Sequence, residues 1–258
     1  MRRNFLSRSR GVVLVVALLL AWEISARSGL VRSANWPPFS AVVVALVRGI
    51  ANGELVAVVG SSLWRMLQGY VLGSAIGIAV GIALAMVRPV RYTLLPAIEL
   101  LRPIPITAVI PPLIFVLGLE DRLKIFCIAF SVFFPIALNT MAGVASVDPI
   151  YEQVAKTFGV PSPAMLRRVI IPAAMPMIFA GLRTGVAIAL IVTVISEMIA
   201  GQQGIGYYLM SMEFAMRATD MYAVIILLTL VAYAINRGFV AWEAQIIRWA
   251  RTRDFAGT

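Results

Sequence analysis

Long apolar tracts dominate this chain of 258 residues, and short polar segments rich in Arg separate them. Hydrophobic residue types make up 61% of the chain and charged types 13%, with a mean hydropathy of +0.93. No soluble domain can hide that much apolar surface, so the chain must reside in lipid. The tracts are continuous and do not show the short alternating segments of a barrel, which indicates helices. The sequence therefore predicts an all-α integral membrane protein.

The residue types that are missing exclude several classes of function. The chain has no His, which removes His-based acid–base catalysis, His metal ligation and Ser-His-Asp or Cys-His triads. Its one cysteine, Cys127, lies inside an apolar tract, so there is no disulfide framework. No GxxxxGK[ST] loop occurs, so any ATP hydrolysis must take place on another chain. The net charge of +10 comes from residues at the ends of apolar tracts, which favours orientation in a membrane over nucleic-acid binding.

Six tracts are predicted to span the membrane. They comprise residues 11–26, 68–87, 102–119, 124–147, 184–200 and 221–242. Residues 39–50 form a shorter apolar helix flanked by Arg48, which we expect to lie outside the membrane at its interface. The predicted organisation is an N-terminal span with an external segment (1–60), a transmembrane core with a polar loop at 148–172 (61–249) and a tail (250–258).

The first tract allows two interpretations. A basic start followed by a short apolar core is also typical of a cleaved signal peptide. Trp22 and Glu23 precede the position where cleavage would occur and do not suit such a site. We therefore expect a retained span with a cytoplasmic N-terminus.

The basic residues near the span ends predict the orientation. Assigned to the inside are Arg2, Arg3, Arg8, Arg10, Arg88, Arg91, Lys156, Arg167, Arg168, Arg248, Arg251 and Arg253. Assigned to the outside, over loops at least as long, are Arg27, Arg32, Arg48, Arg122, Lys124 and Arg217. This bias predicts that both termini and the loop 148–172 are cytoplasmic.

Glycines recur every four residues in the second tract. They are Gly69, Gly73, Gly77 and Gly81. Four glycines in one register form a smooth groove that lets another helix approach closely. The partner is either a helix of the same chain or one from a second copy.

The third tract is interrupted by prolines, and these residues are candidates for a transport pathway. They are Pro103, Pro105, Pro111 and Pro112, preceded by Arg102. Prolines kink or unwind a helix, and the freed backbone is tolerated in a membrane only where protein or water meets it. A structural kink without a pathway role is the alternative. Arg102 and Arg183 could attract an anion or anchor the chain at the interface, and Glu197 could be functional or reach outward to the interface.

The polar loop 148–172 contains a short amphipathic helix. Asp148 and Pro149 are a helix-start signal, and Gly159 stops the helix before two further prolines. The residues at helical spacing on its apolar face are Ile150, Tyr151, Val154, Ala155 and Phe158, while Glu152, Gln153 and Lys156 fall elsewhere. Such a helix could also simply lie on the membrane surface.

This loop resembles the cytoplasmic signature of the membrane subunits of bacterial ABC importers, which reads Glu-Ala-Ala, three residues, Gly, nine residues, Ile-x-Leu-Pro. Ala155, Gly159 and Pro172 match it outright, and Val169 and Ile171 are conservative replacements. The positions of the family's Glu and first Ala hold Gln153 and Val154.

Further segments resemble the same family, and the first of them resembles its importers for sulfonates, taurine, nitrate and similar solutes. They are Arg-Pro-Ile-Pro at 102–105, the Phe-Pro, Asn-Thr and Gly residues within 134–143, Gly-Leu-Arg at 181–183 and Gly-Ile-Gly-Tyr at 204–207. The resemblance covers about residues 54–249 and implies the six-span permease of a type I ABC importer in a bacterial inner membrane.

The resemblance also implies partners. The helix at 150–159 would dock on one of two ATPase subunits, which carry the ATP and Mg, and this non-catalytic chain would hold no cofactor. A second permease, identical in this branch, and a periplasmic or lipoprotein binding protein would complete the importer. The alternatives are a secondary carrier or channel without an ATPase, a membrane enzyme and a scaffold without transport. A carrier usually shows internal repeats, of which none is convincing here, and an enzyme would need converging catalytic groups.

Overall fold

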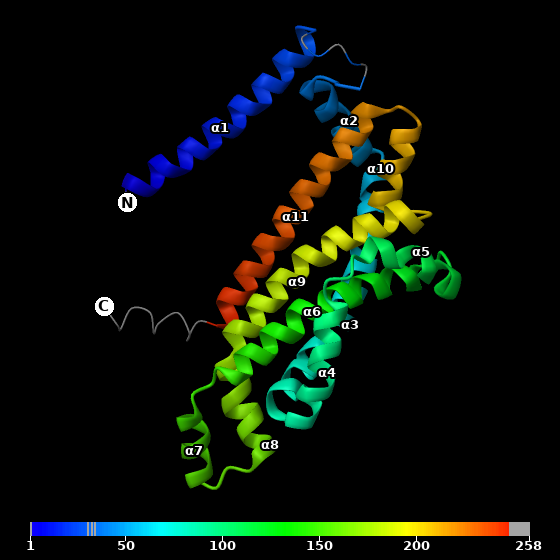
Figure 1. The fold of residues 1–258 in the computed structure, drawn as a ribbon. Helices are drawn as coiled ribbons and strands as arrows, with labels where there is room; N and C mark the ends of the chain where they lie inside the picture. Colours follow the sequence, from blue (N-terminus) through cyan, green and yellow to red (C-terminus); the bar gives the residue numbers. More distant parts are fainter. Residues whose placement is uncertain (1, 30, 32, 34, 248–258) are drawn as a thin grey trace.

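The computed structural model describes residues 2–29, 31, 33 and 35–247, and nearly all of them lie in helices (Figure 1). In chain order the elements are α1 (Arg2–Arg27), α2 (Phe39–Ala51), α3 (Glu54–Met86), α4 (Arg88–Leu101), α5 (Ile106–Leu117), α6 (Asp121–Ala145), α7 (Pro149–Thr157), α8 (Ser162–Met165), the π-helix η1 (Leu166–Ile170), α9 (Ile171–Ala200), α10 (Ile205–Phe214) and α11 (Ala218–Ile246). The predicted all-α class is confirmed. The predicted tail, 250–258, and three basic residues assigned to it or just before it (Arg248, Arg251 and Arg253) lie outside the described residues.

Four helical stretches within the described residues are long and apolar enough to cross a membrane. They are Glu54–Met86, Asp121–Ala145, Ser162–Ala200 and Ala218–Ile246. The bent pair of α4 and α5 raises this number to five if it counts as one span. The helix α2 is apolar but shorter than these stretches.

The third predicted span differs from a single helix over 102–119. The chain already becomes helical at Arg88, well before residue 102, because Pro89 is tolerated in a first helical turn. It then breaks before Ile106, and α4 and α5 meet at an angle of 100°. Pro103 and Pro105 lie at this break, since proline cannot continue the hydrogen-bond ladder of a helix.

The helix α3 begins at Glu54, well before the predicted start at residue 68. Gly53 adopts a positive φ of 79° and ends the preceding turn. The side chain of Asn52 then accepts a hydrogen bond from the backbone N–H of Glu54 at 3.0 Å, which satisfies one free donor of the new helix. The segment 54–67 is therefore the first part of one 33-residue helix.

The core of the bundle is formed by α3, α6 and α9 (Figure 1). The glycines of α3 face α6 of the same chain: a Cβ added to Gly69 would lie 2.6 Å from Ile128, and one added to Gly81 would lie 2.5 Å from the carbonyl oxygen of Ala137. Contacts advance along both helices together, so α3 and α6 run parallel. The absent side chains let the two backbones approach closely.

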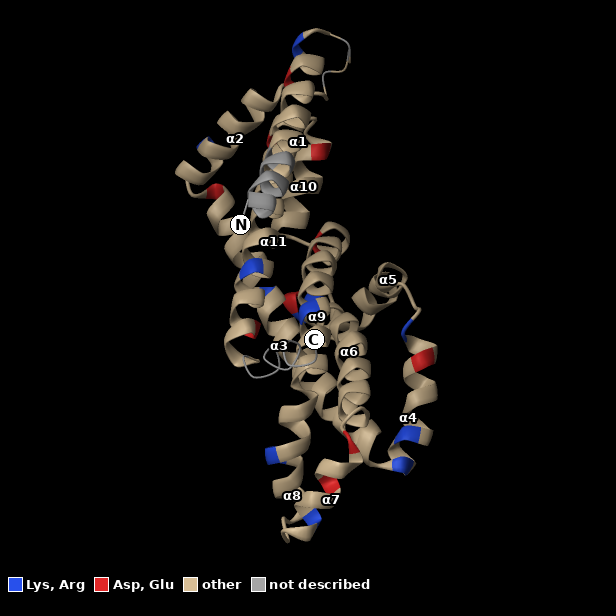
Figure 2. Ribbon diagram, turned by 90° about the vertical axis from the view of Figure 1, so that its left-hand side faces the viewer, with Lys and Arg blue, Asp and Glu red and all other residues tan. Residues whose placement is uncertain are grey.

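The bundle has two distinct ends. The helices α7 and α8 lie at one end, and α2 and α10 lie at the other (Figure 1). Charged residues lie mainly near turns and helix ends, and long stretches of ribbon between carry none (Figure 2). This distribution is what a membrane-crossing bundle requires.

Candidate functional site

The helix α7 is defined by local signals at both of its ends. The carboxylate of Asp148 accepts a hydrogen bond from the backbone N–H of Ile150 at 2.9 Å, and Pro149 occupies the first turn. At the other end Gly159 has a φ of 66°, and the N–H of Val160 bonds to the carbonyl of Ala155 at 3.0 Å. A left-handed glycine followed by such a bond is a common helix terminator. The start and stop predicted from the sequence are both confirmed.

The apolar face of α7 is largely uncovered. The exposed fractions are 55% for Ile150, 41% for Tyr151, 49% for Val154 and 81% for Phe158. Only Ala155 turns inward and is buried. On the opposite face Lys156 pairs with Glu152 at 2.8 Å. Such an apolar surface outside a bundle is typical of a docking site.

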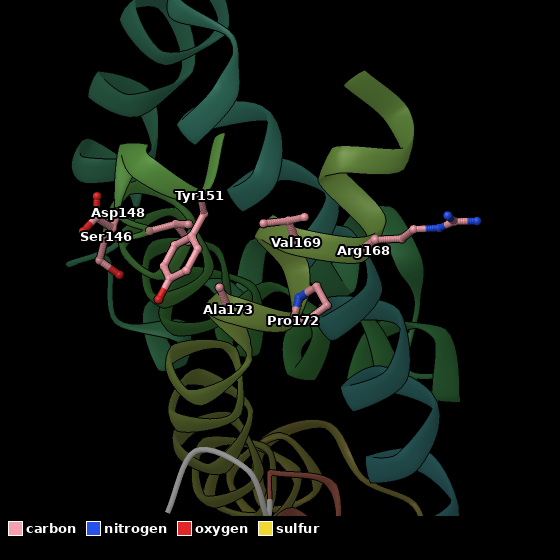
Figure 3. Close-up of a pocket in the computed structure, with 8 residues that line it drawn as sticks. Ser146, Asp148, Tyr151, Arg168, Val169, Pro172 and Ala173 are labelled. Carbon is pink, nitrogen blue, oxygen red and sulfur yellow. The ribbon is translucent and has the colours of Figure 1, made fainter. Parts of the chain in front are cut away.

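A crevice of about 450 Å³ separates the start of α7 from the start of α9. Its lining residues are Ser146, Val147, Asp148, Tyr151, Arg168, Val169, Pro172 and Ala173. The ring of Tyr151 lies between Asp148 and Val169, while the side chain of Arg168 extends away from the others (Figure 3). The crevice is therefore mainly apolar and leaves α7 partly detached from the bundle.

The segment between α8 and α9 winds as a π-helix, Leu166–Ile170. The backbone N–H of Ile171 bonds to the carbonyl of Leu166, five residues back. Pro172 follows, and its ring would collide with the carbonyl four residues back in a regular helix. The wider turn relieves that collision, which gives a physical reason for Pro172 in this loop.

The candidates on the broken helix lie on the surface of the chain. Arg102, Pro103 and Pro105 are exposed at the bend between α4 and α5, and Pro111 and Pro112 are exposed on α5. The structure gathers them on one bent segment.

Two other pathway candidates already have partners within the bundle. The guanidinium of Arg183 pairs with Glu243, which joins α9 to α11. The carboxylate of Glu197 is fully buried and pairs with Arg65 at 2.8 Å. The alternative that Glu197 reaches outward to the interface was wrong, because the paired guanidinium holds it inside.

The sequence analysis missed Arg65 and Ser62, which contact Glu197. Both lie just before residue 68, where the second span was predicted to start. A single Arg in the first half of a long apolar helix was the available signal, since an ionisable residue within a membrane-spanning helix usually faces a partner.

Comparisons with known proteins assign the chain to a family. Residues 73–250 match the family of binding-protein-dependent transport system inner membrane components. The permease protein SsuC of Bacillus subtilis strain 168, named for aliphatic sulfonates transport, is 28% identical over 95% of this chain and 89% of its own length. The taurine transport system permease protein TauC of Escherichia coli strain K12 is 30% identical over 91% of this chain and 87% of its own length.

The fold is also known from solved structures. A chain of the MetNI methionine ABC transporter, in inward-facing conformations, is similar with a TM-score of 0.65 and 18% identity, over 74% of this chain and 95% of that one. The chain therefore belongs to the family of inner membrane components of binding-protein-dependent transport systems, and it is a non-catalytic permease subunit of an ABC importer.

Proposed function

We propose that two identical copies of this chain enclose one translocation path and that two ATPase subunits grip their α7 helices. The ATPase subunits bind the ATP and Mg. A periplasmic or lipoprotein binding protein delivers the solute at the end of the bundle that carries α2 and α10 (Figure 1). ATP-driven closure of the ATPase pair moves α7, and the permeases then open outward to receive solute. This coupling requires a docking free energy that differs between the two conformations.

The uncovered apolar face of α7 is the observation that carries the proposal. Phe158 and Ile150 expose 81% and 55% of their surfaces beyond the end of the bundle. Burial of a side chain the size of Phe158 contributes about 1.5–3 kcal/mol. A groove on an ATPase subunit would supply this cover, and the match of Ala155, Gly159 and Pro172 to the importer signature supports that occupant.

The proposed topology has six spans, formed by α1, α3, the pair α4–α5, α6, α9 and α11. In this arrangement the end that carries α7 is cytoplasmic, and both termini share its side. The contacts of α1 support a retained first span: Trp22 donates a hydrogen bond to the carbonyl of Pro37 at 3.0 Å, and Glu23 accepts one from the N–H of Ser40 at 2.9 Å. The proposed units are 1–60, 61–249 and 250–258.

We propose a small anionic solute, a sulfonate such as taurine or a similar anion such as nitrate. This rests on the relatives named for aliphatic sulfonates and taurine. The exposed bend of Arg102, Pro103 and Pro105, with Pro111 and Pro112 beyond it, is the proposed pathway lining. Arg183 and Glu197 are paired with Glu243 and Arg65, so we expect them to affect the pathway through these partners and not by binding the solute directly.

The docking proposal is tested by Phe158→Ser. The side chain is 81% exposed, so we expect its loss to leave the fold of the permease intact. We expect the ATPase subunit to co-purify with the variant at a level reduced about tenfold or more, as the loss of one buried aromatic anchor predicts. Uptake of labelled taurine, where the wild type shows it, falls in parallel.

The matched control is Lys156→Ser, on the opposite face of the same helix. Its side chain is 64% exposed and pairs with Glu152. The proposal is supported if the ATPase subunit co-purifies normally with Lys156→Ser and is lost from Phe158→Ser. Equal recovery of the ATPase with both variants would show that the apolar face of α7 is not the docking surface.

A further inference from the structure

Two fully buried charges face each other where α3 meets the end of α9. Arg65 is 2% exposed and Glu197 is 0% exposed. They lie at the end of the bundle opposite α7, next to the turn from α9 to α10. Burying such a pair costs desolvation free energy. Removing one partner destabilises the fold strongly, because it leaves an uncompensated buried charge.

The carboxylate of Glu197 is satisfied from three directions. It accepts hydrogen bonds from Arg65 Nε at 3.1 Å and Nη2 at 2.8 Å. The hydroxyl of Ser62 on α3 lies 2.8 Å from each carboxylate oxygen. The backbone N–H of Gly206 on α10 donates at 3.1 Å. One side chain of α9 therefore holds α3 and α10 together.

The guanidinium of Arg65 extends the same connection. Its Nη2 also donates to the backbone carbonyl of Gln203 at 3.2 Å, within the turn before α10. Its Nη1 lies 3.3 Å from Asp121, the first residue of α6, and the buried Lys124 reaches the same carboxylate at 3.2 Å. The hydroxyl of Ser62 in turn accepts the N–H of Ile205 at 2.8 Å. Four segments of the chain thus converge on one pair.

The glycines of the turn explain how it fits over these charges. Gly204 has a φ of 107°, and a Cβ there would collide with the carboxylate of Glu197 and the guanidinium of Arg65. A Cβ on Gly206 would collide with the backbone of α9. The Gly-Ile-Gly pattern at 204–206 is therefore the sequence that lets the backbone wrap closely around a buried ion pair.

We propose that Arg65, Ser62 and Glu197 form a permanent clamp, which keeps α3, the end of α9 and α10 together as one rigid body throughout the transport cycle. The inference rests on the proposed function. The helix α9 begins at the loop that carries α7 and ends at the clamp. A displacement of α7 therefore moves α9, α3 and α10 together, because the turn between α9 and α10 does not bend.

The test measures access to a buried position of the turn in the assembled transporter. Ile205→Cys, in a Cys127→Ala background, places a thiol at a site that is 1% exposed. A membrane-impermeant maleimide should label it slowly, both without nucleotide and with a non-hydrolysable ATP analogue. Adding Glu197→Gln should speed labelling about tenfold or more in both states, because the turn loses its anchor. Arg65→Lys should give an intermediate rate, since an ammonium keeps the charge and lacks the planar fork.

The matched control is Asp220→Asn, which breaks the exposed pair of Arg217 and Asp220 at the start of α11. It should leave the labelling rate unchanged. Faster labelling on adding the ATP analogue to the intact clamp would overturn the proposal, and so would unchanged labelling in Glu197→Gln. The double variant Arg65→Met/Glu197→Met leaves neither charge unpaired, so we expect it to fold and also to label fast.

If both Glu197→Gln and the double variant Arg65→Met/Glu197→Met were lost from the membrane, the pair would be needed for folding alone. That result would likewise overturn the proposal. Failure of the docking proposal would be recognised separately. In that case the ATPase co-purifies with Phe158→Ser as with the wild type, while the labelling results for the clamp stand unchanged.

Discussion

The surroundings of individual glycines in α3 decide what a side chain would do there. A Cβ on Gly73 would lie 2.5 Å from the carbonyl oxygen of Ala129 and 2.9 Å from its Cα, whereas Gly60 on the same helix has nothing within 4 Å. Gly73→Ala should destabilise the fold by about 1–3 kcal/mol, because two packed backbones must separate. Gly60→Ala should be neutral or stabilise by up to about 1 kcal/mol, since alanine favours helix. Thermal unfolding of the purified permease in detergent measures both, and equal midpoints would contradict the predicted packing.

Residue patterns in the sequence predicted local features, such as helix ends, better than contacts between residues far apart in the chain. The cap of Asp148 and the stop at Gly159 were predictable because each is decided by neighbouring residues. The partner of Glu197 was not, since Arg65 is separated from it by 132 positions and only the packing of α3 on α9 brings them together. The need for glycine at position 204, where a Cβ would collide with this pair, depends on the same packing.

At the scale of single elements, the π-helix η1 joins α8, which follows α7, to the transmembrane α9. Pro172→Ala supplies a backbone N–H. It also removes the ring that would collide with the carbonyl of Arg168 in a regular helix, so η1 can return to α-helical geometry. We expect that change to rotate α8 relative to α9 about the helix axis and so to shift the loop that carries α7. We expect the ATPase still to co-purify, because the apolar face of α7 is intact, while uptake falls about fivefold or more as the coupling geometry shifts.

The control for this element is Pro176→Ala, one turn further along α9. Pro176 is exposed inside a regular helix, past the π-helix, so its replacement should leave uptake close to the wild-type value. A fall in uptake of the same size in both variants would mean that any proline of this helix matters and that the π-helix has no special role.

The elements that sequence reasoning placed wrongly share one physical cause. Hydropathy locates where a chain can lie in lipid, but not where a helix begins outside it, so the start of α3 at Glu54 was missed. Proline content showed that the segment 102–119 would be interrupted, yet the 100° bend depends on how α4 and α5 pack on their neighbours. Long helices with strong periodicity were predictable, and their bends and extensions depend on tertiary contacts.

For the whole molecule, the proposed orientation in the membrane can be tested at the two ends of the bundle. The parallel α3 and α6 place the turn at Val87 and the loop at Asp148 at one end, and Gln202 lies at the other, beside the clamp. In a Cys127→Ala chain, Gln202→Cys should react with an impermeant maleimide added to intact spheroplasts, since its side chain is exposed. Val87→Cys, 44% exposed at the opposite end, should react only after the membrane is opened. The reverse pattern would place α7 outside the cell, where no ATPase could reach it, and would refute the proposed coupling together with the cytoplasmic termini.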